Sequence, residues 1–122
     1  MGIFEPMTPK VYDPISYASN LYDRLQENIQ TAKSNLQADE ELAAYYYMAS
    51  GGIIGIKSFG YHNPYLIIIY GVDEQMNKCQ VLVHPYSFQI VLKVLKIENQ
   101  NQRKTIGFIG DINRTSESGQ EH

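Results

Sequence analysis

Apolar residues recur every three or four positions through the first third of the chain, with charged residues between them. Asp13-Pro14 favours a helix start, because Asp is a good N-cap and proline fits the first helical turn. The apolar positions that follow are Ala18, Leu21, Tyr22, Leu25, Ile29, Ala32 and Leu36. This spacing predicts a helix over about 14–37.

A second helical segment is expected over Glu40–Ala49, because acidic residues favour a first turn and Gly51-Gly52 provides an end. The pattern leaves two alternatives open. The segments form either two helices or one long helix with a bend near Gln37–Asp39.

After Gly52 the pattern changes to β-branched and aromatic runs separated by turn residues, which is typical of strands. The predicted strands are Ile53–Phe59, Tyr65–Tyr70, Cys79–Val83 and Thr105–Ile109. Tyr65–Tyr70 is apolar throughout and is expected to be buried on both faces.

Between the last two strands, Ser87 is a plausible N-cap for a helix whose apolar stripe is Phe88, Val91, Leu92 and Leu95. The expected fold class is therefore α+β. It has a long N-terminal helix (or two), a small, mostly antiparallel sheet, one further helix and a C-terminal strand.

Length and composition narrow this picture to one domain. The 122 residues suffice for a single core, and we expect it over 1–112, with 113–122 as a polar, disordered tail. The formal charge of −3 argues against binding to long nucleic acids. A single cysteine, Cys79, fits a reducing compartment, and no apolar run is long enough for a membrane span.

Tyrosine is abundant, with 10 residues in the chain, three of them consecutive at Tyr45–Tyr47. On a helix, three successive rings would cover most of the circumference, so at least one would leave the core. Tyrosine is enriched at subunit contacts. We therefore expect a homo-oligomer, against the alternative that these rings cover the sheet of a monomer.

No residue pattern for catalysis or metal binding is evident. Cys79 lies within a predicted strand, where a buried thiol is the ordinary outcome. The histidines, His62, His84 and His122, have no metal-binding spacing. We therefore expect no catalytic residue, no metal site and no cofactor.

Three segments have residue types suited to a nucleotide-like ligand. In 84–88, Tyr86 or Phe88 could stack on a base, although Phe88 also fits the core. In 99–104, an amide such as Asn99 could bind a purine edge and Arg103 a phosphate, unless this is a solvated loop. In 110–114, Asp111 could hold ribose hydroxyls and Arg114 a second phosphate.

Three blocks resemble a known family: NPYLIIIYG at 63–71, QVLVHPY at 80–86 and KTIGF at 104–108. They are similar to small phage proteins that counter Thoeris immunity by acting as sponges for its signal. The resemblance covers roughly 60–109.

Membership would imply binding of cyclic ADP-ribose isomers, such as glycocyclic ADP-ribose, without cleavage. The pockets would lie between subunits of a dimer-based assembly that can reach a hexamer, and some members also hold cyclic oligonucleotides. The stacking aromatic would be Phe88, with Tyr86 as the alternative. Asn99 would hold the adenine edge, and Arg103 and Arg114 the phosphates. The location would be the cytoplasm of an infected bacterial host cell.

Two other functions compete with this one. The first is a hydrolase of the same kind of nucleotide, with His84 as the acid or base. The second is a structural, partner-binding oligomeric domain in which the tyrosines form a protein interface.

Overall fold

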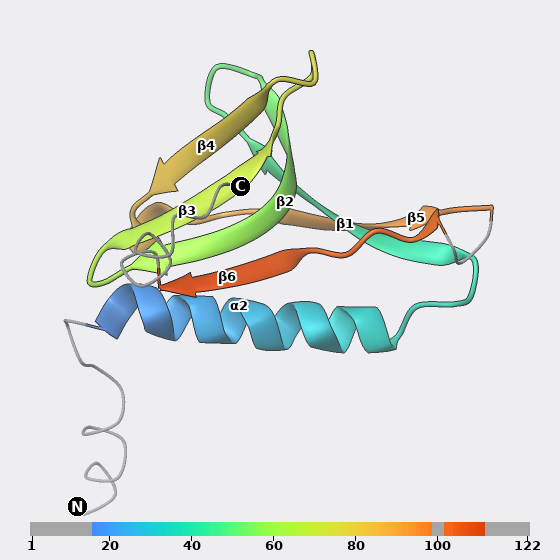
Figure 1. The fold of residues 1–122 in the computed structure, drawn as a ribbon, viewed down its shortest axis with the longest axis horizontal. Helices are drawn as coiled ribbons and strands as arrows, with labels where there is room; N and C mark the ends of the chain where they lie inside the picture. Colours follow the sequence, from blue (N-terminus) through green and yellow to red (C-terminus); the bar gives the residue numbers. More distant parts are fainter. Residues whose placement is uncertain (1–15, 99–101, 112–122) are drawn as a thin grey trace, which may run out of the picture.

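A single α-helix lies along a strongly curved sheet of six strands (Figure 1). This computed structural model describes residues 16–98 and 102–111. The strand order is β4-β3-β2-β1-β5, and β6 adds to β2. The expected Asp13-Pro14 helix start and the expected tail at 113–122 lie outside the described residues.

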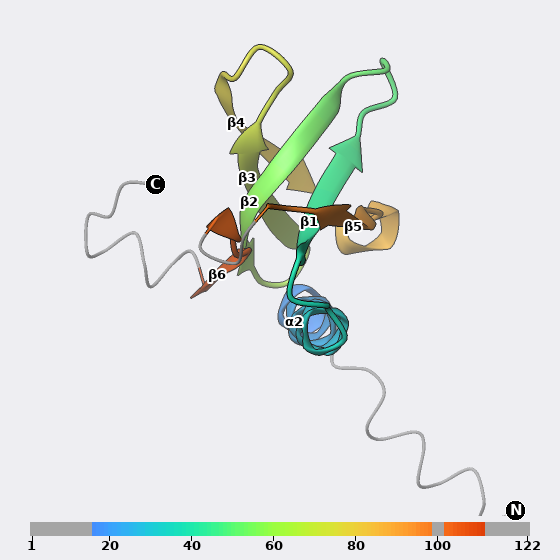
Figure 2. The same ribbon diagram turned by 90° about the vertical axis from the view of Figure 1, so that its right-hand side faces the viewer.

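The helix α2 spans Tyr17–Ser34, within the range predicted for the long N-terminal helix. Its buried residues are Ala18, Tyr22, Leu25 and Ile29, spaced four, three and four apart. This spacing places them on one face, which packs against the sheet. Figure 2 shows α2 end-on beneath the curved sheet.

The second helical segment expected at 40–49 is wrong: Glu40–Tyr47 is strand β1. Leu42 and Ala44 are buried and Tyr46 packs against the core, so alternate residues face inward. β1 pairs antiparallel with both β2 (Ile53–His62) and β5. These two ladders outweigh the helix propensity of Glu, Leu and Ala.

The helix expected after Ser87 is also wrong. Pro85–Ser87 forms one 3-10 turn, η3, and Val91–Lys96 is strand β5. The stripe that predicted a helix is also compatible with a strand, because the region around it is rich in β-branched residues. Leu92 packs against the core, opposite Ala44 of β1.

The fold class is therefore corrected. The structure is a mostly antiparallel sheet with a single α-helix in the described ranges, and the several helices expected of the α+β fold are absent from them. The other strands are β3 (Leu66–Val72), β4 (Lys78–Val83) and β6 (Gly107–Asp111). Each lies where a strand was expected, shifted by one or two residues.

Strand β2 is the centre of the sheet because it pairs with three others. Its first three residues pair with β1, residues 55–62 with β3, and residues 58–61 with β6 in parallel. β1 and β6 thus share one edge of β2 and diverge from it. The register with β3 shifts between Ile56 and Ser58, which leaves Lys57 as the bulged residue.

The core lies between α2 and the concave face of the sheet. Phe59, Ile67, Ile69 and the helix residue Ile29 are almost fully buried there. Ile68, between two of these residues, is also buried. Of the run Tyr65–Tyr70 that was expected to be buried on both faces, Ile67–Ile69 are buried, whereas Tyr65 is 44% exposed and Leu66 and Tyr70 are partly buried.

The turn between β2 and β3 holds the beginning of α2. Asn63 Oδ1 accepts a hydrogen bond from the Ser19 amide at 2.9 Å, and the Pro64 carbonyl accepts one from the Ala18 amide at 2.9 Å. Ser16, the N-cap residue, provides no side-chain cap. Amides of the first helical turn are therefore satisfied by tertiary contacts.

Candidate functional site

Tyr86 belongs to a cluster of four rings at one end of the molecule. Its ring lies 5.4 Å from that of Tyr17 and 5.0 Å from that of His84, and Tyr65 stacks on His84 at 5.1 Å. We call Tyr17, Tyr65, His84 and Tyr86 the aromatic cluster. Tyr65 and Tyr86 are 44% and 73% exposed. The aromatic cluster is therefore a group of packed rings that is partly exposed on the surface.

His84 is fixed within this cluster. Its Nδ1 accepts a hydrogen bond from the Tyr86 amide at 3.1 Å, which caps η3. An imidazole that accepts at Nδ1 carries its proton at Nε2 when it is neutral. His84 therefore has a structural role, because its hydrogen bond stabilises the turn that positions Tyr86 in the cluster.

Phe88 packs against the core. It is half-buried and its ring lies 6.2 Å from that of the buried Phe59. Of the two readings of this residue, the core reading matches its surroundings.

Arg103 holds the loop before β1. Its Nε donates to the Glu40 carbonyl at 2.9 Å, and Nη2 donates to the Gln37 carbonyl at 2.8 Å. Gln37 lies three residues beyond the end of α2, and Glu40 is the first residue of β1. The guanidinium group is thus engaged in stabilising the connection from α2 to β1.

The structure does not bring Tyr86 and Arg103 together. Tyr86 contacts Tyr17, the first residue of α2, whereas Arg103 binds Gln37, beyond its last residue. A helix of 18 residues is about 27 Å long. One nucleotide cannot contact both residues of a single protomer. Asp111 ends β6 beside Tyr61, and Asn99 and Arg114 lie outside the described residues.

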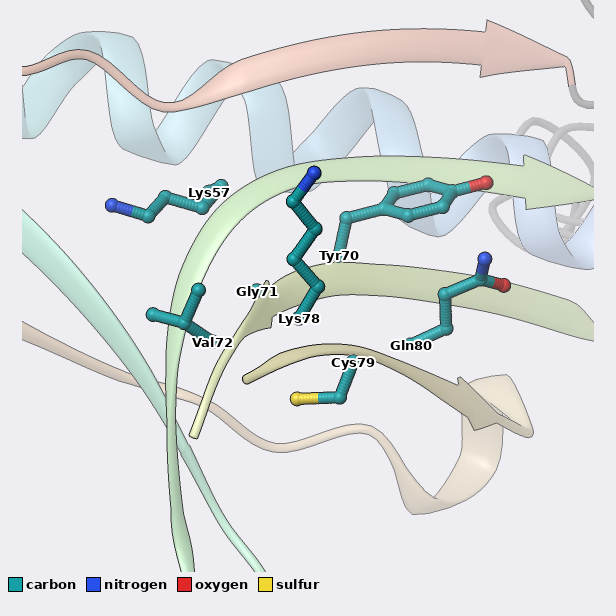
Figure 3. A pocket seen from close by; sticks show the side chains of 7 residues that line it. All are labelled: Lys57, Tyr70, Gly71, Val72, Lys78, Cys79 and Gln80. Carbon is teal, nitrogen blue, oxygen red and sulfur yellow. The ribbon is translucent and has the colours of Figure 1, made fainter. Parts of the chain in front are cut away.

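A different surface has the geometry of a binding site. It is a hollow of about 610 Å³ on β2, β3 and β4 (Figure 3). We call it the basic hollow, and its lining residues are Lys57, Tyr70, Gly71, Val72, Lys78, Cys79 and Gln80. Because Ile67 and Ile69 face α2, the alternate residues Tyr70 and Val72 face away from it.

The local sequence explains how these side chains gather. Tyr70 pairs with Gln80, and Val72 with Lys78, across β3 and β4. Lys57 joins them from the bulge in β2. Figure 3 shows the side chains of Lys78, Tyr70 and Gln80 extending to the same side of these strands.

A glycine allows the close approach of the strands under the hollow. A Cβ at Gly71 would overlap the Gly55 carbonyl oxygen and lie 2.8 Å from Ile54 Cγ2. No side chain fits at this position without moving β2 away from β3. Gly71 therefore permits the close approach of β2 and β3 beneath the hollow.

The basic hollow has a surplus of positive charge. In the part of the chain that the structure describes, the ion pairs are those of Lys96 with Asp39 and Glu40, so Lys57 and Lys78 pair with no described carboxylate. Their strands are separated by β3, so the two backbones are about 10 Å apart. Long lysine side chains can bridge this gap around one anionic group.

The uncharged residues of the hollow add hydrogen bonding and an aromatic face. Partial burial raises the pKa of Tyr70, so its hydroxyl stays protonated. The Cys79 pKa is raised by partial burial and by the charge of Asp73, which disfavours the nucleophilic thiolate. The described residues also contain no group of three or more His, Cys, Asp and Glu side chains that could hold a metal ion.

The residues of the basic hollow were read from the sequence only as strands and a turn. The sequence did offer one signal for a shared face. Tyr70 and Val72 occupy alternate positions on one strand, and Lys78 and Gln80 do so on the next. The bulge that adds Lys57 has no comparable signal in the sequence.

Comparison with protein-family models, curated proteins and solved structures found no match for this chain. Within the described residues, no helix combines the length and the apolar character that a membrane crossing requires.

Proposed function

We propose that this chain binds a small phosphorylated, nucleotide-like ligand in the basic hollow and holds it without chemical change. The observation that carries the proposal is the grouping of two lysines without carboxylate partners, a half-buried tyrosine and an amide around one hollow of about 610 Å³. Ligand pockets have volumes of about 300–1,000 Å³.

Each lining residue has a role in this proposal. Lys57 and Lys78 bind the phosphate oxygens, and Gln80 forms hydrogen bonds with a base or sugar. The Tyr70 ring provides an apolar contact. The nearby Asp73 carboxylate is engaged within its own turn, because its Oδ1 accepts hydrogen bonds from the amides of Gln75 and Asn77.

Sequestration is the form of binding that we propose, and the resemblance to Thoeris sponges supports it. A sponge competes by affinity, so it requires enclosure and hydrogen-bond partners rather than a general base. The raised pKa of Cys79 also favours binding over nucleophilic chemistry. The proposed ligand is then a cyclic ADP-ribose isomer, and the proposed location is the cytoplasm of an infected bacterium.

The proposal is tested by calorimetry with glycocyclic ADP-ribose and, separately, ADP. Lys57→Met and Lys78→Met should each weaken binding by about 1.5–3 kcal/mol, because each removes a charge-assisted hydrogen bond. Arg24→Gln is the matched control, since it removes one exposed positive charge from α2. Equal affinity in all the variants would contradict the proposed site.

Recovery of the ligand tests sequestration separately. The wild-type complex is heated, and the released nucleotide is analysed by mass spectrometry. Intact ligand is expected. The appearance of new products would instead support the hydrolase alternative, which His84→Ala would then abolish.

A second function is favoured by the exposed aromatic cluster. We infer that it forms a contact between copies of the chain. Leu82 of β4, two residues before His84 in the sequence, is also exposed, at 63%. Exposed rings that are already packed together can bury apolar area at little further cost in side-chain entropy.

A further inference from the structure

A second, smaller hollow adjoins the basic hollow at the fork where β1 and β2 separate. Lys57 and Val72 line both, so the two hollows share a boundary. We call the smaller one the fork hollow, and its lining also includes Glu41, Tyr45, Lys104 and Thr105. In Figure 3 the Lys57 side chain extends away from the Tyr70 ring.

The size of the fork hollow limits what it can hold. Its volume is about 150 Å³, and a cavity of about that volume accommodates one benzene molecule. It therefore suits a single ring, such as one sugar or part of a base. The larger volume of the basic hollow is left for the phosphates and the rest of the ligand.

The two hollows differ in charge. The basic hollow has Lys57 and Lys78 and no carboxylate in its lining. In the fork hollow, Glu41 offsets the charge of one of the two lysines in the lining, Lys57 and Lys104. An anionic group is therefore favoured beside Lys57 and Lys78, whereas a neutral group with hydrogen-bond donors is favoured beside Glu41.

The Glu41 carboxylate is held in place with one oxygen available. Its Oε1 accepts a hydrogen bond from the Lys104 amide at 3.1 Å. Glu41 also lies on β1 opposite Leu95 of β5, so its backbone is fixed by strand pairing. No described residue donates a hydrogen bond to Oε2. A carboxylate oxygen in this setting is a strong acceptor for a hydroxyl or amino group.

We propose that Glu41 binds a hydrogen-bond donor on a ring of the ligand, while Lys57 and Lys78 bind its phosphates. This inference rests on the proposed function and specifies the ligand class: a phosphorylated compound with a hydroxyl- or amino-bearing ring, such as a nucleoside diphosphate. Lys57, at the boundary, contacts the phosphate nearest that ring.

Two probes separate the two ends of the site. ADP has both a diphosphate and a donor-bearing ring system, whereas inorganic pyrophosphate has only the anionic part. Wild-type protein should bind ADP more tightly than pyrophosphate in calorimetry. Glu41→Gln should weaken ADP binding roughly tenfold or more, because the charged acceptor is lost, and should leave pyrophosphate affinity unchanged within about twofold.

Glu74→Gln is the matched control, because Glu74 is an exposed carboxylate in the turn between β3 and β4. It should leave both affinities unchanged. Glu41→Gln retains an acceptor for the Lys104 amide, and a matching melting temperature will confirm that the fold is intact. If Glu41→Gln weakens both probes equally, or neither, the inference is overturned.

Two ADP analogues identify which group of the ligand donates to Glu41. With 2′,3′-dideoxy-ADP the effect of Glu41→Gln should disappear if Glu41 binds the ribose, and with IDP it should disappear if Glu41 binds the adenine amino group. Persistence of the effect with both analogues would overturn the assignment to either donor. If the wild-type protein binds neither ADP nor pyrophosphate, the proposed function itself fails.

Discussion

At the scale of single residues, the surroundings decide what a charged side chain does. Arg103 has the chemistry to bind a phosphate, yet it donates to two backbone carbonyls beside the end of α2. Lys57 and Lys78 have no described carboxylate partner and face a hollow. The residue type therefore identifies possible ligands, and only the contacts show whether the donor is already used.

Tyr22 gives a pH dependence at this scale. Burial raises its pKa to about 12, while the hydrogen bond from the Gly110 amide opposes the shift and the neighbouring Tyr61 and Asp23 add to it. In the unfolded chain Tyr22 ionises near its ordinary value of about 10. As the pH rises from about 10 to about 12, the unfolded state loses a proton that the folded state retains, and stability falls.

Urea unfolding midpoints between pH 9 and pH 11.5 will test this effect. Tyr22→Phe should reduce the decline of stability over this range, although the variant is less stable at neutral pH because the Gly110 amide loses its acceptor. Tyr70, whose pKa is also raised, contributes in both proteins. The same slope in wild type and variant would rule out Tyr22 as a source of the pH dependence.

At the scale of secondary structure, β1 and α2 depend on partners far away in the sequence. β1 has residues with good helix propensity and becomes a strand because β2 and β5 pair with it on both sides. α2 has the periodicity of a helix, but its first amides are satisfied by Asn63 and Pro64. The helix is therefore attached to the β2–β3 turn as well as to the core.

Asn63→Ala should lower the free energy of unfolding by about 1–2 kcal/mol. The variant loses the bond from the Ser19 amide to Oδ1 and the bond from Nδ2 to the Ser19 hydroxyl at 3.2 Å. Asn63→Asp is the control, because it keeps an acceptor and places a negative charge beside the helix N-terminus. An equal loss of stability in both variants would show that the acceptor at Oδ1 contributes little to stability.

At the scale of the whole molecule, the candidate surfaces lie on different parts of the fold. The basic hollow is formed by strands on the face away from α2, whereas the aromatic cluster gathers Tyr17 from the start of α2 with residues beside the strands. Ligand binding and assembly can therefore be changed independently by mutation.

Light scattering will test the proposed contact between copies. The wild-type chain should have the mass of a dimer or a larger oligomer, and Tyr86→Ser should shift it toward the monomer because an exposed apolar ring is lost. Met76→Asn is the matched control: Met76 is also 73% exposed, lies outside the cluster and has a positive φ of 68° that Asn tolerates. A monomeric wild-type protein, or equal masses in all three proteins, would exclude this interface.

The sequence by itself determined the elements whose pattern is local. The period of α2, the isoleucine run of β3 and the turns between the strands follow from side-chain spacing and turn chemistry, so they could be predicted. Tertiary structure decided β1 and β5, because EELAAYYY and VLKVLK are compatible with either helix or strand and only pairing between distant segments distinguishes them. It also decided the candidate site, because Lys57, Tyr70 and Lys78 lie on three different strands and line one hollow only through strand pairing, the bulge at Lys57 and the close approach at Gly71.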